Sequence, residues 1–422
     1  LVQFLLVALV AGAGADNVVR KDVSHLTDDE VQALHGALHD VTASTGPLSF
    51  EDITSYHAAP ASCDYKGRKI ACCVHGMPSF PFWHRAYVVQ AERALLSKRK
   101  TVGMPYWDWT QTLTHLPSLV TEPIYIDSKG GKAQTNYWYR GEIAFINKKT
   151  ARAVDDRLFE KVEPGHYTHL METVLDALEQ DEFCKFEIQF ELAHNAIHYL
   201  VGGKFEYSMS NLEYTSYDPI FFLHHSNVDR LFAIWQRLQE LRGKNPNAMD
   251  CAHELAHQQL QPFNRDSNPV QLTKDHSTPA DLFDYKQLGY SYDSLNLNGM
   301  TPEQLKTELD ERHSKERAFA SFRLSGFGGS ANVVVYACVP DDDPRSDDYC
   351  EKAGDFFILG GQSEMPWRFY RPFFYDVTEA VHHLGVPLSG HYYVKTELFS
   401  VNGTALSPDL LPQPTVAYRP GK

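Results

Sequence analysis

The sequence predicts an α+β multidomain fold in which a mainly α-helical domain precedes an antiparallel β domain. Residues from about 24 to 290 show mostly helical periodicity. After about residue 315 the chain changes to short β-branched and aromatic runs that are separated by turn signals. The length of 422 residues also fits about two domains.

Amphipathic segments account for the helical part. The first begins at Thr27 with a capping residue and an acidic first turn, and it carries Val31, Leu34, Leu38 and Val41 on one face. Further segments with helical periodicity cover residues 82–100, 169–180, 185–200 and 227–243. The stretches that join them are long and rich in Pro, Gly and Tyr. This pattern indicates a helical domain with long connections.

The β part consists of short apolar runs at residues 317–326, 332–340, 355–361, 369–378 and 391–401. Turn signals such as the acidic stretch "PDDDPRSDD" lie between them. This pattern is typical of an antiparallel sandwich or barrel. The last residues, from Ser407 to Lys422, contain four prolines and are predicted to form a semi-rigid tail or linker.

The N-terminus indicates a secreted protein, and the net charge restricts its partners. Residues 1–15, "LVQFLLVALVAGAGA", form an apolar run that ends in small residues, which predicts a partial signal peptide and a mature chain that begins near Asp16. The chain begins with Leu rather than Met, so we expect the start of the precursor to be missing. No other stretch is apolar enough for a membrane helix. The net charge of −15 argues against nucleic acid or an anionic membrane as partner.

Secretion permits disulfides, and the cysteine count is odd. Six of the seven cysteines can pair, which leaves one that needs an explanation. Cys72 and Cys73 are adjacent in "ACCVHGMPSFPFWH", two residues before His75. A single sequon, at Asn402, predicts a glycan on a surface loop.

Two pairs of histidines have the spacing of metal ligands. His194 and His198 are four apart in a helical pattern, so both project from one face. His224 and His225 are adjacent in "DPIFFLHHSNVDRLFAIW" and would point about 100° apart on a helix, so we expect at most one of them to share a metal with the first pair. Buried imidazoles need partners, and three of them from two helices make a credible metal site.

A second group of histidines lies nearer the N-terminus. Pro78 and Pro81 prevent one helix from carrying both His75 and His84, so His75 is expected on a constrained loop. His57 lies just upstream. Two groups of three histidines suggest a pair of metal ions, and all-imidazole ligation suits copper, zinc or nickel.

The segment "HELAH" at His253 to His257 matches the zinc-protease motif HExxH. The extended form of that motif needs a histidine at 263, where the chain has Phe263, and no Glu occurs between Glu254 and Glu303 to serve as the other common third ligand. A solvated histidine pair beside a disulfide cysteine is therefore favoured over a secreted zinc hydrolase.

Taken together, "CCVHGMPSFPFWHR", "HNAIH" and "DPIFFLHHSNVDRLFAIW" resemble the functional units of molluscan haemocyanins, members of the tyrosinase-like type 3 copper proteins. The resemblance covers residues 16–414 and is strongest for the first, N-terminal unit of a long precursor. It implies a helical dicopper domain at 16–300 with a four-helix bundle at the site, a β-sandwich domain at 301–412 that covers the site, and a linker at 413–422.

The resemblance also implies the roles of single residues. His57, His75 and His84 would hold one copper ion, and of the second group the ligands would be His194, His198 and His225. Cys73 would form a thioether to His75, which accounts for the odd cysteine and fixes a ligand on a loop. The implied disulfides are Cys63–Cys72, Cys184–Cys251 and Cys338–Cys350.

The function that the resemblance implies is reversible oxygen transport in the haemolymph. Two Cu(I) ions would bind one O2 between them and become a peroxide-bridged pair of Cu(II) ions. The protein partners would be other units of a large homo-oligomer. A carrier must shield this site, and Leu359 in "DFFILGG" is our candidate for the residue that fills the entrance. A catechol oxidase or tyrosinase is the main alternative, and a latent o-diphenol oxidase activity is compatible with the carrier.

Overall fold

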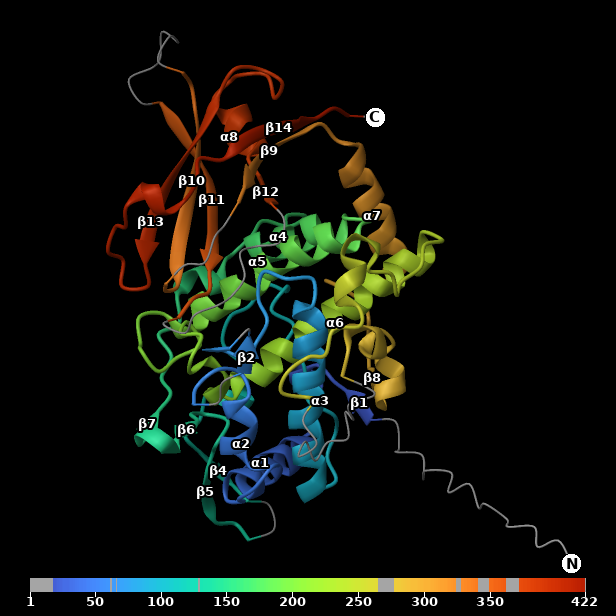
Figure 1. Cartoon of the computed structure of the whole chain (residues 1–422), viewed down its shortest axis with the longest axis vertical. Helices are drawn as coiled ribbons and strands as arrows, with labels where there is room; N and C mark the ends of the chain where they lie inside the picture. The colour runs from blue at the N-terminus through green and yellow to red at the C-terminus, as the bar shows by residue number, and fades with distance from the viewer. Residues whose placement is uncertain are drawn as a thin grey trace, which may run out of the picture.

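The computed structural model describes most of the chain, namely residues 18–60, 63–65, 67–127, 130–264, 277–323, 328–340, 349–361 and 372–421. The expected signal peptide at 1–15 lies outside these residues. A helical domain occupies one end and a sandwich of strands the other, as the sequence predicts (Figure 1). Each part has its own cluster of buried apolar side chains.

Seven helices build the helical part of the described chain: α1 (Asp28–Thr42), α2 (Phe50–Ser55), α3 (Phe80–Lys98), α4 (His169–Leu178), α5 (Phe183–Gly202), α6 (Ile220–Leu241) and α7 (Pro302–Ser314). α1 begins as predicted, because Thr27 and Glu30 form a reciprocal capping box. α6 begins at Ile220, four residues before His224, which was expected with His225 to open this helix. Its first turns, "IFFLHHS", are buried on every side, and such a helix shows no amphipathic period in the sequence.

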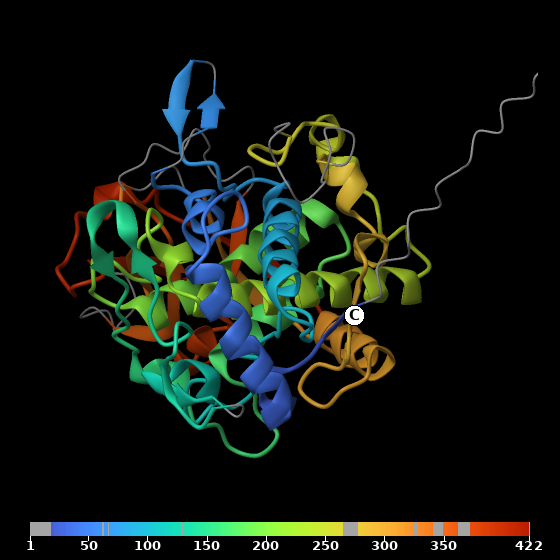
Figure 2. The ribbon, with the colours of Figure 1, turned by 90° about the horizontal axis from the view of Figure 1, so that it is seen from below.

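Short strands reinforce the loops of the helical part. β1 (Val18–Arg20) pairs in parallel with β8 (Tyr290–Tyr292) and ties the N-terminal segment to a distant part of the chain. The hairpin of β2 (Cys63–Tyr65) and β3 (Arg68–Ile70) projects from the body (Figure 2). The remaining hairpins join β4 (Ile124–Ile126) to β5 (Ala133–Thr135) and β6 (Glu142–Ile143) to β7 (Lys148–Lys149).

Two antiparallel sheets form the sandwich, which resolves the choice between sandwich and barrel. One sheet has the order β11-β10-β13 and the other β12-β9-β14. Their bounds are β9 (Arg317–Phe322), β10 (Ala331–Cys338), β11 (Cys350–Ile358), β12 (Phe373–Asp376), β13 (Tyr393–Ser400) and β14 (Thr415–Arg419), and α8 (Thr378–His383) follows β12. Apolar side chains on the facing surfaces of the two sheets make the core of this domain.

Two elements bear on the expected domain boundaries. Leu305 and Leu309 of α7 belong to the helical core, so α7 packs with the helical domain although it lies beyond the expected boundary at residue 300. The expected linker at 413–422 contains β14, which pairs with β9 over five residues. The apolar alternation of "TVAYR" between two prolines suits an edge strand, and the proline content concealed this signal.

The sandwich rests on α5 through β11. Successive side chains of a strand point to opposite faces. Phe357 and Leu359 accordingly join the helical core, whereas Phe356 and Ile358 join the sandwich core. The ring of Phe357 lies 4.6 Å from that of Tyr199 on α5. One strand thus joins both hydrophobic cores.

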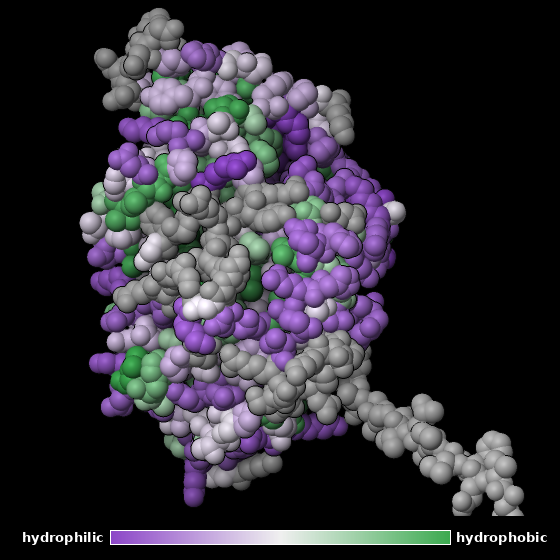
Figure 3. All heavy atoms as spheres, viewed as in Figure 1, coloured by the Kyte–Doolittle hydropathy of each residue, from purple (hydrophilic) through white to green (hydrophobic). Residues whose placement is uncertain are grey.

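All three disulfides are those that the resemblance implies. Cys63–Cys72 links β2 to the loop that carries His75, Cys184–Cys251 links α5 to the chain beyond α6, and Cys338–Cys350 joins the ends of β10 and β11. Cys73 remains as a buried free cysteine. Hydrophilic side chains cover much of the surface around the helical part on the face in Figure 3. Within the described residues, no helix has the length and hydrophobicity that a bilayer crossing requires.

Candidate metal centre

Four segments of the helical domain bring the predicted histidines together. His57 follows α2, His75 lies on the loop before α3, and His84 lies in the second turn of α3. α5 carries His194 and His198, and α6 carries the adjacent pair His224 and His225. Each of these side chains is almost fully buried, with at most 3% of its surface exposed.

The first three histidines form one group. The ring centroids of His57, His75 and His84 lie 5.0–5.8 Å apart. The sulfur of Cys73 is part of the same group, within 4.8 Å of a ring nitrogen of His57 and of His75. His75, which was predicted to lie on a loop because of Pro78 and Pro81, therefore lies beside His84 of α3.

The second group faces the first. His194, His198, His224 and His225 each offer a nitrogen, and these atoms lie within 4.8 Å of one another. The ring of His225 is stacked on that of His84 at 4.4 Å, and the rings of His194 and His75 are 5.5 Å apart. The two groups thus meet face to face, which is the arrangement that two neighbouring metal ions need.

Hydrogen bonds at Nδ1 fix the orientation of most of these rings. His57 donates to the carbonyl of Leu212 at 3.1 Å, and His198 donates to that of Met209 at 2.8 Å. His84 donates to its own helix at Phe80, 3.0 Å away. A ring that donates from Nδ1 presents an unprotonated Nε2, which is the form that binds a metal.

The Nε2 atoms that point into the centre lack protein partners. In the described residues, Nε2 of His57, His75, His84 and His194 is buried and makes no hydrogen bond. A buried polar atom without a partner is costly, and one such atom from each of four rings is unusual. Metal ions bound between the groups would satisfy these nitrogens, so the residues fit the dicopper centre that the resemblance implies.

The ionisation of the site also suits metal binding. Burial lowers the pKa of His84 and His198 to about 3 and holds the pKa of His57, His75, His194 and His225 well below the ordinary value. The rings are therefore neutral at physiological pH, as metal ligation requires. Burial raises the pKa of the Cys73 thiol, so that this group is protonated when unmodified.

Proximity does not choose between His224 and His225, because both belong to the second group. The expectation that at most one of them shares a metal with the pair on α5 therefore stays a prediction. Nε2 of His225 lies 3.3 Å from Nε2 of His198, and its ring also stacks on His84. His224 instead contacts Trp109 and His194 and lies away from the first group. This geometry favours His225 as the third ligand.

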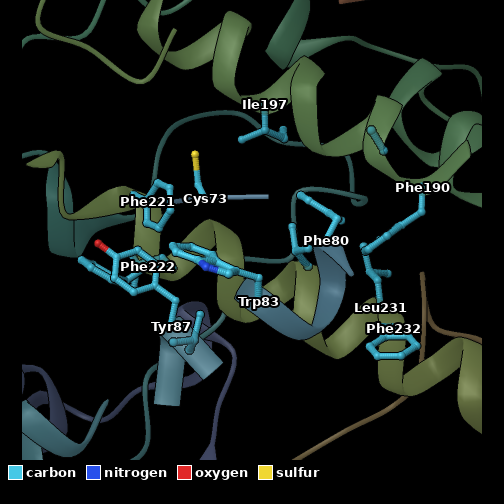
Figure 4. Packing of buried hydrophobic residues seen from close by; sticks show 14 of the residues in the cluster. Cys73, Phe80, Trp83, Tyr87, Phe190, Ile197, Phe221, Phe222, Leu231 and Phe232 are labelled. Atoms are coloured by element: carbon cyan, nitrogen blue, oxygen red, sulfur yellow. The ribbon is translucent and has the colours of Figure 1, made fainter. Parts of the chain in front are cut away.

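Aromatic side chains enclose the centre. Phe80 and Trp83 of α3 and Phe221 of α6 lie around Cys73 (Figure 4). The ring of His57 contacts both Phe221, at 5.2 Å, and Trp83, at 5.8 Å. Such a lining excludes water and keeps the rings of the ligands in place. Leu359 is 6% exposed and packs in the same apolar cluster, on the side of the sandwich.

The other predicted sites lie apart from this centre. His253 and His257 are exposed on and just beyond a 3-10 helix (Asp250–Leu255), and neither belongs to a group of potential metal ligands among the described residues. Asn402 lies in an exposed turn, where its side-chain oxygen accepts from the backbone N–H of Thr404.

The sequence did not reveal the hydrogen-bond acceptors that orient the histidine ligands. The orienting acceptors are mainly backbone carbonyls, which have no signature in a sequence. Glu191 could have been noticed as a charge amid apolar residues of α5. It accepts from the N–H of Gly76, beside His75, at 2.7 Å, and burial raises its pKa to about 8.

Comparisons with known proteins agree with the fold. The common central domain of tyrosinase matches residues 47–238, and the haemocyanin β-sandwich matches residues 312–420. Hemocyanin 1 of Megathura crenulata is 68% identical over 99% of the chain, which spans only 12% of that protein. Unit G of the haemocyanin β-C chain of Helix pomatia is 45% identical, and the match covers 98% of this chain and 97% of the unit.

Solved structures give the same result. A functional unit of octopus haemocyanin matches with a TM-score of 0.87 and 42% identity, over 96% of this chain and 100% of the unit. Deoxygenated haemocyanin from Rapana thomasiana matches with a TM-score of 0.91, 40% identity and the same coverage. The chain therefore belongs to the molluscan haemocyanins, as a functional unit with a tyrosinase-like helical domain and a haemocyanin β-sandwich.

Proposed function

We propose that this unit carries O2 reversibly at a dinuclear copper centre. One ion would be held by His57, His75 and His84, and the other by His194, His198 and His225. The observation that carries this proposal is the meeting of two buried histidine groups in which Nε2 of His57, His75, His84 and His194 has no partner among the described residues. Bound there, the copper pair would supply the redox chemistry that takes up one molecule of O2 and releases it.

The protein's own groups would make this uptake reversible. Burial keeps His57 and His198 neutral, and carbonyl acceptors keep their rings correctly turned, so no proton has to move when the metal is bound. The aromatic lining and the sandwich keep water and external reductants from the centre. Copper fits better than zinc, because first-row affinities for nitrogen ligands peak at copper and the family is a copper family.

The oxygen carrier is tested by a spectrum and a metal count. The purified unit is expected to hold about two copper ions and to show a near-ultraviolet absorption that appears in air and disappears under argon through repeated cycles. Bleaching with each cycle, or one zinc ion in place of copper, would refute the proposal. Rapid hydroxylation of monophenols by the intact unit would favour a tyrosinase instead.

A latent o-diphenol oxidase activity is compatible with this site. The helical domain matches the central domain of tyrosinase, so the two functions share a ligand scaffold. We propose that Leu359 and Phe357, which β11 directs into the helical core, form the cover that keeps phenols out. Turnover of catechol is therefore expected to be slight while the sandwich is in place.

A thioether between Cys73 and His75 is expected in the mature protein. The thiol is buried, unpaired with another cysteine, and close to the ring of His75. Peptide mass spectrometry of the reduced protein should find the single peptide that contains both residues lighter by the mass of two hydrogens. Alkylation of Cys73 in the unfolded, non-reduced protein would show instead that the thiol is free.

The cellular context follows from the same reasoning. We propose a secreted, extracellular protein of the haemolymph that carries a glycan at Asn402 and works as one of several units in a large homo-oligomer. The three disulfides are consistent with an oxidising compartment. The acidic net charge of −15 favours solubility at high concentration.

A further inference from the structure

A short segment between α5 and α6 contacts one ligand of each histidine group. Within residues 209–212, the carbonyl of Leu212 accepts from Nδ1 of His57, in the first group. The carbonyl of Met209 accepts from Nδ1 of His198, in the second group. The path of this segment therefore sets the orientation of two rings that serve different metal ions.

The same segment is bonded to the β-sandwich. The hydroxyl of Ser330, just before β10, donates to the carbonyl of Ser210 at 2.6 Å. The N–H of Leu212 donates to the carbonyl of Gly360, just after β11, at 3.2 Å. Ser330 and Gly360 are in turn bonded to each other, because the N–H of Gly360 donates to the serine hydroxyl at 2.9 Å.

The chain after β11 also lies beside the residue that follows the segment. A Cβ atom added to Gly361 would lie 2.3 Å from the carboxylate of Glu213, which directly follows the segment. The ends of β10 and β11 are in direct contact with the segment through the hydrogen bonds of Ser330 and Gly360. A shift of the sandwich would displace the acceptors of His57 and His198 together.

We propose that the β-sandwich tunes oxygen affinity through residues 209–212, with Ser330 as the positioning residue. This inference rests on the proposed oxygen-carrier function. His57 depends on the segment more strongly than His198 does, because the hydroxyl of Thr215 also contacts Nδ1 of His198, at 2.8 Å. Changes in the groups that orient a metal ligand alter metal affinity, and Ser330 acts one bond further away.

The test compares two variants of Ser330 with a control on the same domain. Ser330→Ala removes the hydroxyl, and Ser330→Thr keeps it. Ser400→Ala removes a hydroxyl whose partners among the described residues lie in its own turn, at Asn402 and Thr404. Oxygen equilibrium curves, thermal unfolding and the rate at which a chelator removes copper are measured for each.

Ser330→Ala is expected to lower oxygen affinity by about threefold or more and to speed the loss of copper to the chelator, with a thermal midpoint like that of Ser400→Ala. Ser330→Thr should restore the wild-type values. The inference would be overturned if Ser330→Ala had the same oxygen affinity and rate of copper loss as Ser400→Ala. It would also be overturned if Ser330→Ala and Ser330→Thr lowered oxygen affinity equally. A wild-type unit that binds no oxygen would refute the proposed function itself.

Discussion

Replacing His225 with asparagine is expected to abolish the oxygen-dependent absorption and to leave about one copper ion per unit. The reason is that Nε2 of His225 converges on Nε2 of His198 at 3.3 Å, while its ring stacks on His84 of the other group. Loss of this ring leaves the second ion with two imidazoles and a gap on the side that faces the first ion. Metal analysis and spectra in air and under argon measure both effects.

The matched control is His224→Asn, one position away on the same buried helix. Both ring nitrogens of His224 lack partners among the described residues, so the residue is a fair competitor as a ligand. Its ring lies against Trp109 rather than against the first group. His224→Asn should therefore keep both copper ions and the absorption. Loss of one copper ion in His224→Asn but not in His225→Asn would show that His224 is the ligand instead.

Asp229→Asn is expected to lower the free energy of unfolding by about 3–5 kcal/mol. Asp229 lies between two fully buried arginines, with its carboxylate 2.9 Å from Arg20 and 2.5 Å from Arg85. It also accepts from the hydroxyls of Tyr290 and Tyr292. The amide keeps the volume but removes the carboxylate that compensates buried Arg85, and it leaves Arg20 with Glu92 as its remaining carboxylate partner among the described residues. Denaturant unfolding of the apo-unit measures the loss without a contribution from metal.

The effect has a defined pH dependence. Burial raises the pKa of Asp229, but Arg85 and Arg20 outweigh burial and hold the pKa below its ordinary value. A lowered pKa in the folded state gives stability that is present above the unfolded-state pKa of about 3.9 and is lost as the pH falls through the folded-state value. The difference between wild type and Asp229→Asn should therefore be full at pH 7 and shrink in acid.

An exposed ion pair provides the comparison. Lys306 and Asp310 pair across one turn of α7 at 2.6 Å, with 33% and 57% of their side chains exposed. Lys306→Ala should change the unfolding free energy by about 0.5 kcal/mol or less. Equal effects of Lys306→Ala and Asp229→Asn would contradict the view that buried charge compensation dominates here.

Much of the fold was readable in the sequence. The capped start of α1 and the apolar runs of β9, β10 and β13 were predicted at nearly their observed positions, because period and capping are local properties. The early start of α6, the docking of α7 on the helical core and the pairing of β14 were missed. Each of these depends on a neighbour that is distant in the sequence.

The sequence by itself determined which residues are available for a metal centre, since the spacing of His194 and His198 and the prolines around His75 restrict where imidazoles can point. Only the tertiary structure decided how the two groups face each other, and it places the ring of His225 against that of His84 in the first group. It also supplies the carbonyls of Met209 and Leu212, which orient His198 and His57. A backbone acceptor is the same chemical group at every residue, so its role arises only from the packing that brings it to a ring.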